Sequence, residues 1–102
     1  MTKKRILSGM RPTGKLHIGH FVGALENWIR LQDEYESFHL IADYHVLTTD
    51  LDTSDVYQNS IDMLIDWLAC GLDPVKNPMF RQSQIKQHAE LSLIFGMLIT
   101  VN

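Results

Sequence analysis

A threefold alternation of β-prone and helix-prone segments is the feature that most constrains the fold of this chain. Three short runs suit buried strands: RILSG (5–9), FHLIAD (38–43) and PMFRQS (78–83). Each precedes a segment in which apolar residues recur with a period near 3.6. This alternation is typical of a parallel sheet with right-handed crossovers and helices on both faces. We therefore predict an α/β, Rossmann-like fold whose ligands bind beyond the carboxyl ends of the strands.

The helices are predicted from their apolar periodicity and their end signals. The first runs from near Ile18 to near Glu36, and the second ends at Gly71, a residue type that favours the left-handed helix terminus. The second is capped by Asp52 or Thr53, and residues 44–55 before it form a long loop. The predicted apolar faces are Phe21, Leu25, Trp28, Ile29 and Leu31, then Tyr57, Ile61, Leu64, Ile65 and Leu68, and, in a third helix from Gln87, Leu91, Ile94, Phe95 and Leu98. Trp28 and Trp67 are expected in the core.

Length and composition indicate one globular domain of a reducing compartment. The chain has 102 residues, a net charge of −3 and no basic block, so it is not expected to supply most phosphate contacts to a nucleic acid. Its one cysteine, Cys70, excludes an internal disulfide and is expected to be buried. The N-terminus lacks the apolar region of a signal peptide, and LSLIFGMLITV (91–101) is shorter than a membrane span. We therefore expect a cytoplasmic protein without membrane contact.

No stop signal follows the third helix. Residues 99–102 hold neither the glycine nor the proline that commonly ends a helix. We expect the chain to be part of a longer protein, in which the apolar side of this helix has a partner.

The segment SGMRPTGKLHIGHFVGALENW (8–28) gathers four of the six glycines and two of the five histidines. It follows the first strand and opens the first helix, where free N–H groups and the helix dipole attract anions. His17 and His20 project from the same side of the first turn, and Gly19 leaves a flat gap beside the backbone. With the nearby cations Arg11 and Lys15, the segment suits a nucleoside triphosphate.

Other functional interpretations of this segment fit less well. Lys15 is followed by leucine rather than a hydroxyl residue, so the segment is not a Walker A loop, and the glycine spacing is not G-x-G-x-x-G. A metal site built on His17 and His20 lacks a third ligand nearby, so no metal site is predicted. Loop glycines with surface histidines remain the structural alternative.

The sequence HIGH (17–20) resembles the signature of the class I aminoacyl-tRNA synthetases. Its lead-in, SGMRPTGKL (8–16), narrows the resemblance to the tryptophanyl and tyrosyl subclass. The stretches GALENW (23–28), IADYH (41–45) and ACGLDP (69–74), followed by FRQS and HAEL, resemble the tryptophanyl-tRNA synthetase family. The resemblance covers the whole chain and implies that residues 1–102 are the N-terminal part of that family's nucleotide-binding domain.

The resemblance implies a reaction and a set of site residues. ATP, entering with Mg²⁺, would activate L-tryptophan to tryptophanyl-adenylate, and the tryptophanyl group would pass to its tRNA; the family also implies a homodimer. His17 and His20 would be catalytic residues at the ATP phosphates. The ATP-binding set would be Arg11, Pro12, Thr13, Gly19 and His20. The amino-acid-binding set would be Leu7, Gly9, Asp43, His45 and Gln82.

Three alternatives stay open on the sequence. A tyrosyl-tRNA synthetase shares the HIGH context, and a non-catalytic ATP-binding module would use the same helix start. An adenylating nucleotidylyltransferase also carries HIGH but lacks the lead-in found here. The family's second signature, KMSKS, its indole-reading residues and its anticodon-binding domain have no counterpart in these 102 residues.

Overall fold

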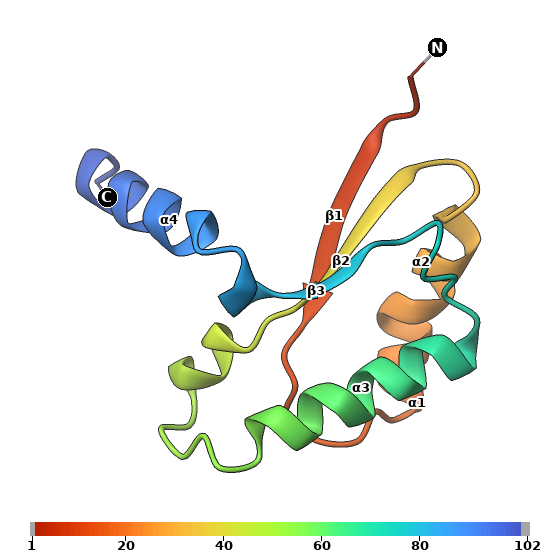
Figure 1. The fold of residues 1–102 in the computed structure, drawn as a ribbon, viewed down its shortest axis with the longest axis horizontal. Helices are drawn as coiled ribbons and strands as arrows, with labels where there is room; N and C mark the ends of the chain where they lie inside the picture. The colour runs from red at the N-terminus through yellow and green to blue at the C-terminus, as the bar shows by residue number, and fades with distance from the viewer. Residues whose placement is uncertain (1, 101–102) are drawn as a thin grey trace.

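A computed structural model describes residues 2–100 as a three-stranded parallel sheet with helices (Figure 1). The strands β1 (Arg5–Met10), β2 (Glu36–Ile41) and β3 (Met79–Arg81) lie in the order β1-β2-β3. Both pairings are parallel, with Gly9 beside Leu40 and Leu40 beside Phe80. The predicted strand–helix alternation and parallel sheet are therefore confirmed.

The first helical region is shorter than predicted and changes its winding. It comprises α1 (Ile18–His20), the π-helical segment η1 (Phe21–Leu25) and α2 (Glu26–Leu31). The predicted end near Glu36 is wrong, because the Glu36 N–H donates to the Lys4 carbonyl and begins β2 there. Residues 32–35, which are predicted to lie in the helix, form the turn between α2 and β2.

The second helix, α3 (Val56–Cys70), follows Asp55, so the predicted cap at Asp52 or Thr53 is wrong. Its end is as predicted: Gly71 has φ +114°, and its N–H donates to carbonyls of the last turn. The apolar face predicted for α3 differs from the face that the structure buries in the core. The stripe Ser60, Met63 and Trp67 is buried, whereas the predicted face is largely open, with Tyr57 65% exposed.

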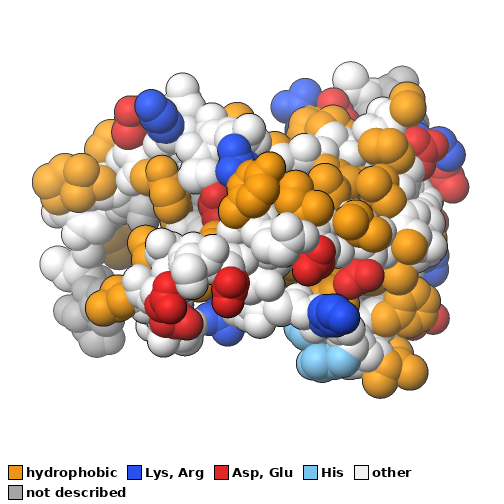
Figure 2. Space-filling view, turned by 60° about the horizontal axis from the view of Figure 1, so that its bottom comes forward, with side chains coloured by type: hydrophobic (Ala, Val, Ile, Leu, Met, Phe, Trp, Pro, Cys, Tyr) orange, Lys and Arg blue, Asp and Glu red, His pale blue; other side chains and the backbone are white. Residues whose placement is uncertain are grey.

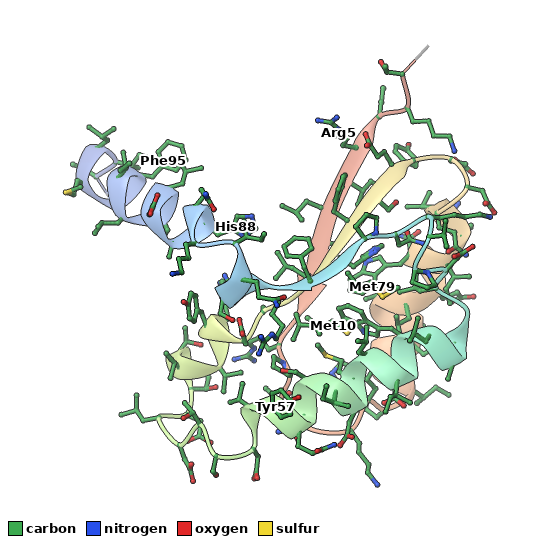
Figure 3. The ribbon with its side chains drawn as sticks, viewed as in Figure 1. Arg5, Met10, Tyr57, Met79, His88 and Phe95 are labelled. Atoms are coloured by element: carbon green, nitrogen blue, oxygen red, sulfur yellow. The ribbon has the colours of Figure 1, made fainter. Side chains whose placement is uncertain are left out.

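The core lies between one face of the sheet and the helices α2 and α3. Trp28 and Trp67 meet edge to face with ring centroids 5.3 Å apart, and the ring of His39 lies 4.3 Å from that of Trp28. Leu25, Ile41, Met63 and Leu72 complete the buried cluster. Met10 and Met79 extend it along the strands (Figure 3). The two tryptophans are core residues as predicted, but Cys70 is exposed, contrary to expectation, because it lies at the helix end beyond Trp67.

Two short 3₁₀ helices follow the carboxyl ends of β2 and β3. The segment η2 (Tyr44–Thr48) occupies part of the predicted loop, and η3 (Gln82–Gln84) takes residues predicted to continue the third strand. The third strand therefore ends at Arg81 rather than Ser83.

The helix α4 (Gln87–Leu98) extends away from the sheet (Figure 1). Its first turn touches the second sheet face, where the His88 ring lies 6.1 Å from that of Phe80. Its apolar side chains are exposed, as is Leu7 on that sheet face at 57%. Hydrophobic side chains consequently appear on the surface at the α4 end (Figure 2). Among residues 2–100, no helix is long and apolar enough to cross a membrane.

His39 makes stability depend on pH between about 4 and 6.5. Burial lowers the pKa of His39 from 6.5 to about 4, and neither ring nitrogen has a hydrogen-bond partner among the described residues. As the pH falls below 6.5, His39 takes up a proton in the unfolded chain but stays unprotonated in the folded chain until the pH nears 4. We therefore expect the free energy of unfolding to fall with pH in this window, by about 3 kcal/mol at most.

Urea unfolding at several pH values, followed by tryptophan fluorescence, measures this dependence. His39→Leu should flatten it, whereas His88→Gln, on α4, should leave it intact. An unchanged slope in His39→Leu would show that other groups cause it. The lowered pKa values of Asp33 and Asp52 place their titration below this window.

Candidate functional site

Two histidines cap the first helix reciprocally. His17 is the N-cap residue, and its Nδ1 accepts a hydrogen bond from the Gly19 N–H at 3.0 Å. His20 Nδ1 accepts in turn from the His17 N–H at 3.2 Å. The two rings lie with centroids 4.0 Å apart. The arrangement satisfies helix N-terminal donors with imidazoles, where serine or threonine paired with glutamate is usual.

The reciprocal cap fixes the tautomer of both histidines. A ring nitrogen that accepts a backbone N–H carries no proton, so each neutral imidazole has its proton on Nε2. Among residues 2–100 neither Nε2–H has a hydrogen-bond partner, so each can donate to a ligand beside the helix N-terminus. The pair can therefore present two hydrogen-bond donors to an anion.

Gly19 is required by the ring of His17. A Cβ at position 19 would lie 2.8 Å from His17 Cε1 and 2.9 Å from His17 Nδ1. The flat gap predicted at Gly19 therefore exists, and the imidazole of His17 lies in it. Gly23, one turn later, faces open space instead.

The loop between β1 and α1 holds the other predicted ATP-binding residues. Arg11 is exposed and its Nη1 donates to Thr49 Oγ1 at 3.3 Å, which ties this loop to η2. Pro12 is fully buried, whereas Thr13 is exposed. Pro12 and Thr13 line a polar cavity of about 420 Å³ that reaches residues 46–59.

Asp43 joins the carboxyl ends of β2 and β3. One carboxylate oxygen accepts from the N–H groups of Tyr44 and Ser83, each at 3.0 Å, and the other accepts from the Ser83 hydroxyl. Both oxygens are thus engaged within the chain. Asp43 holds η2 and η3 side by side.

The same two segments bring together His45 and Gln82. His45 Nδ1 lies 3.0 Å from Gln82 Oε1, and because an amide oxygen only accepts, Nδ1 carries the proton. His45 Nε2 is then an acceptor, the opposite tautomer to that of His17 and His20. His45 and Gln82 form one wall of a cavity of about 770 Å³, whose other wall is α4.

Leu7 and Gly9 lie apart from this cavity, on the sheet face opposite α2 and α3. A Cβ at Gly9 would overlap the Leu40 carbonyl oxygen, so Gly9 permits close contact between β1 and β2. The predicted amino-acid residues therefore divide into a group at η2 and η3, Asp43, His45 and Gln82, and a sheet pair, Leu7 and Gly9.

Sequence reasoning missed Ser83 and Thr49. Ser83 bonds to Asp43 and Thr49 bonds to Arg11, each across about 40 positions of the sequence. No local sequence pattern links residues so far apart in the chain. Within residues 2–100, no group of three or more histidine, cysteine or acidic side chains is placed to hold a metal ion.

A family model described as "tRNA synthetases class I (W and Y)" matches residues 2–102. The tryptophan–tRNA ligase of Aquifex aeolicus is 57% identical over 95 residues, which are 92% of this chain and 24% of that protein. The chain thus spans about a quarter of that relative's length.

Solved structures agree with this match. Tryptophanyl-tRNA synthetase from Mycoplasma pneumoniae superposes with a TM-score of 0.90 at 32% identity, over 97% of this chain and 29% of that one. The Campylobacter jejuni enzyme in complex with ADP and tryptophan gives 0.86 at 34% identity, over 94% and 30%. A tyrosyl-tRNA synthetase from Archaeoglobus fulgidus, at 23% identity and a TM-score of 0.83, shares the fold, covering 99% of this chain and 33% of that one.

Gly19→Ala tests the histidine cap. The new methyl group must displace the His17 ring and break its hydrogen bond to the residue 19 N–H. We expect the ¹⁵N shifts of His17 to move from the Nε2–H tautomer pattern toward exchange between tautomers. The free energy of unfolding should also fall by about 1 kcal/mol, the usual effect of losing a cap.

Gly23→Ala is the matched control, because it adds the same methyl group to the same helix in open space. It should leave the His17 signals unchanged and leave stability equal or up to about 1 kcal/mol higher. Equal behaviour of the two variants would contradict the assigned cap geometry.

Proposed function

Because the chain belongs to the class I tRNA synthetases for tryptophan and tyrosine, we propose that it forms the ATP- and tryptophan-binding part of a tryptophan–tRNA ligase. In the proposed reaction the tryptophan carboxylate attacks the α-phosphate of ATP and pyrophosphate leaves. The tryptophanyl-adenylate then transfers its acyl group to the terminal ribose of the tRNA. The 57% identity to a tryptophan–tRNA ligase supports tryptophan over tyrosine as the substrate.

The histidine pair carries this proposal. Since the carboxylate is already a nucleophile, catalysis consists mainly of positioning and of stabilising negative charge on the phosphates. His17 and His20 each offer an Nε2–H that is already oriented by a backbone hydrogen bond. In the proposed site these two donors contact phosphate oxygens as charge develops there.

The loop after β1 would complete the ATP site. Arg11 supplies a cation, and Thr13 supplies a hydroxyl on the exposed side of the same loop. Pro12 would act through its burial by fixing the path of the loop. Gly19 would serve ATP binding by giving room to the His17 ring.

The amino-acid site is proposed at the carboxyl ends of β2 and β3. The contact with Gln82 leaves His45 Nε2 as an acceptor. This nitrogen would accept a hydrogen bond from a donor group of the substrate. Asp43, whose carboxylate is engaged by Ser83 and Tyr44, would position His45 and Gln82. Leu7 and Gly9 would contribute the sheet surface beside this site.

The remaining partners follow from the family. We propose that Mg²⁺ enters with ATP, that the complete enzyme binds tRNA(Trp) and acts as a homodimer, and that it works in the cytoplasm. A role as a non-catalytic ATP-binding module that uses the same helix start is the second candidate.

His17→Asn separates the two roles of the first histidine. Asparagine keeps an N-cap acceptor but lacks an Nε2–H. We expect the rate of tryptophan-dependent ATP–pyrophosphate exchange to fall about 100-fold in an enzyme of the relatives' length, while the Tm stays within a few degrees. Unchanged exchange in this variant would show that His17 serves the helix alone.

Substrate choice is tested by titrating an enzyme of the relatives' length with ATP, tryptophan and tyrosine, and by measuring exchange with either amino acid. We expect ATP and tryptophan to bind and tyrosine to bind at least about tenfold more weakly, since the site must reject a substrate with a different hydrogen-bonding group. Preference for tyrosine would select the tyrosyl alternative. Binding of ATP without either amino acid would select the non-catalytic module.

A further inference from the structure

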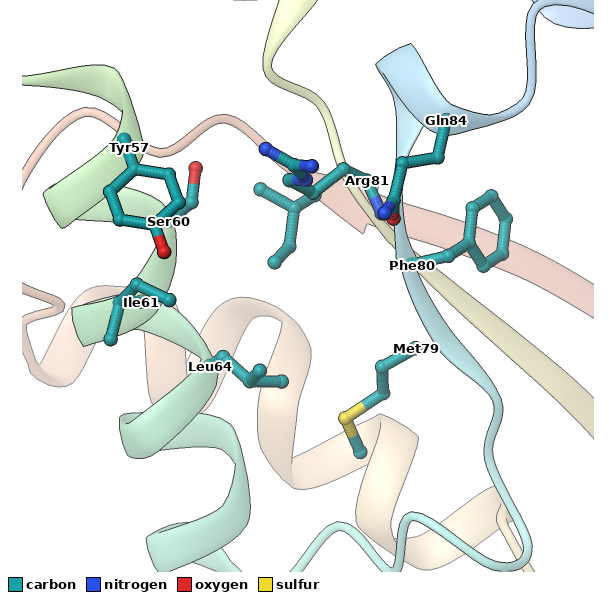
Figure 4. Close-up of a pocket in the computed structure, with 9 residues that line it drawn as sticks. Tyr57, Ser60, Ile61, Leu64, Met79, Phe80, Arg81 and Gln84 are labelled. Carbon is teal, nitrogen blue, oxygen red and sulfur yellow. The ribbon is translucent and has the colours of Figure 1, made fainter.

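A separate cavity of about 270 Å³ lies between α3 and β3 (Figure 4). Its floor is apolar and comes from Ile41, Ile61, Leu64 and Met79. It shares no lining residue with the cavities beside the histidine pair, beside Thr13 or beside His45. Any ligand of this cavity would therefore be distinct from the ATP and tryptophan of the proposed reaction.

Arg81 places a positive charge at one end of this apolar cavity. Figure 4 shows its guanidinium directed toward Ser60 and Tyr57 of α3. Among residues 2–100, the ion pairs are Arg5 with Glu36 and Lys76 with Asp33, so Arg81 has no acidic partner there. The cavity lining contains no carboxylate. A guanidinium stays charged at all ordinary pH, and a half-buried one without a counter-charge favours an anion.

The other polar side chains at the cavity fit an anion as well. Gln84 Oε1 accepts from the Arg81 N–H at 3.2 Å, and within the described part of the chain the Gln84 amide N–H groups have no acceptor, so they can donate to a ligand. The Ser60 hydroxyl already donates to the Val56 carbonyl at 2.7 Å. The free donors therefore lie at the β3 side, next to the guanidinium.

We propose that this cavity binds a small carboxylate with an apolar body, such as an arylalkanoate. Arg81 takes the carboxylate in a two-pronged contact, for which the planar guanidinium is suited. The ring or chain of the ligand lies against Leu64, Met79 and Ile61. The volume is near the lower limit of ligand sites, about 300 Å³, and so selects a single ring with a short acid chain.

The test is an NMR titration of the 102-residue chain with 3-phenylpropionate. Backbone amide signals of residues 57–64 and 79–84 should shift. The uncharged 3-phenylpropanamide should bind at least about tenfold more weakly, because it forms no charge-assisted contact with Arg81. Inorganic phosphate, which has no apolar body, should cause no shift at residues 57–64.

Two variants and a control test the proposed contacts of the ligand. Arg81→Gln should weaken 3-phenylpropionate to the affinity of the amide, and Ile61→Trp, which fills the cavity, should weaken both. Arg30→Gln, on α2, should bind as the unaltered chain does, because Arg30 lies outside the cavity and bonds to Asn27. Circular dichroism checks that each variant is folded.

The proposal is overturned by any of four results. These are no binding, equal affinity for acid and amide, full acid binding by Arg81→Gln, or shifts confined to residues 17–23 or 45–48. The last result would place the acid at the proposed synthetase sites. A failure to bind ATP or tryptophan leaves this test unaffected, since the cavities share no residue.

Discussion

The burial of Trp67 is the interaction on which the rest of the structure depends. Its side chain is fully enclosed, with the ring of Trp28 edge-on at 5.3 Å and that of His39 6.4 Å away. These three rings come from α3, α2 and β2, so one contact fixes both helices on one face of the sheet. Large aromatic rings bury more apolar area than other side chains do. They therefore supply much of the hydrophobic stabilisation in a domain this small, whose core is limited. The enclosed His39 ring follows from the same packing, and so does its low pKa.

The parallel sheet brings the residues of the candidate site together. Because β2 and β3 run in the same direction, the segments that follow them leave the sheet at the same edge. Asp43 then bonds to Ser83, and His45 to Gln82, across residues that are about 40 positions apart. Two hydrogen-bonded contacts of this kind orient the side chains before any ligand arrives. Such pre-orientation removes an entropy cost from binding.

The sequence was sufficient for features that depend on local chemistry. The strand–helix alternation, the helix end at Gly71 and the helix start at the histidines all follow from residue types within a few positions. Features set by distant contacts could not be predicted. The stripe on α3 follows Trp67, Glu36 joins β2 through its hydrogen bond to the Lys4 carbonyl, and β3 stops before Ser83, which bonds to Asp43. The sequence predicts the gap at Gly19, and the structure shows the ring of His17, two residues away, lying in it.

The reciprocal cap has a consequence for how a triphosphate would be held. Each imidazole uses Nδ1 to complete the helix and has only Nε2–H left for a ligand. In the proposed site the pair therefore contributes hydrogen bonds whose direction is set by the cap. Arg11, in the loop before the cap, would supply a cation to the same proposed site, so the orienting donors and the positive charge come from separate residues.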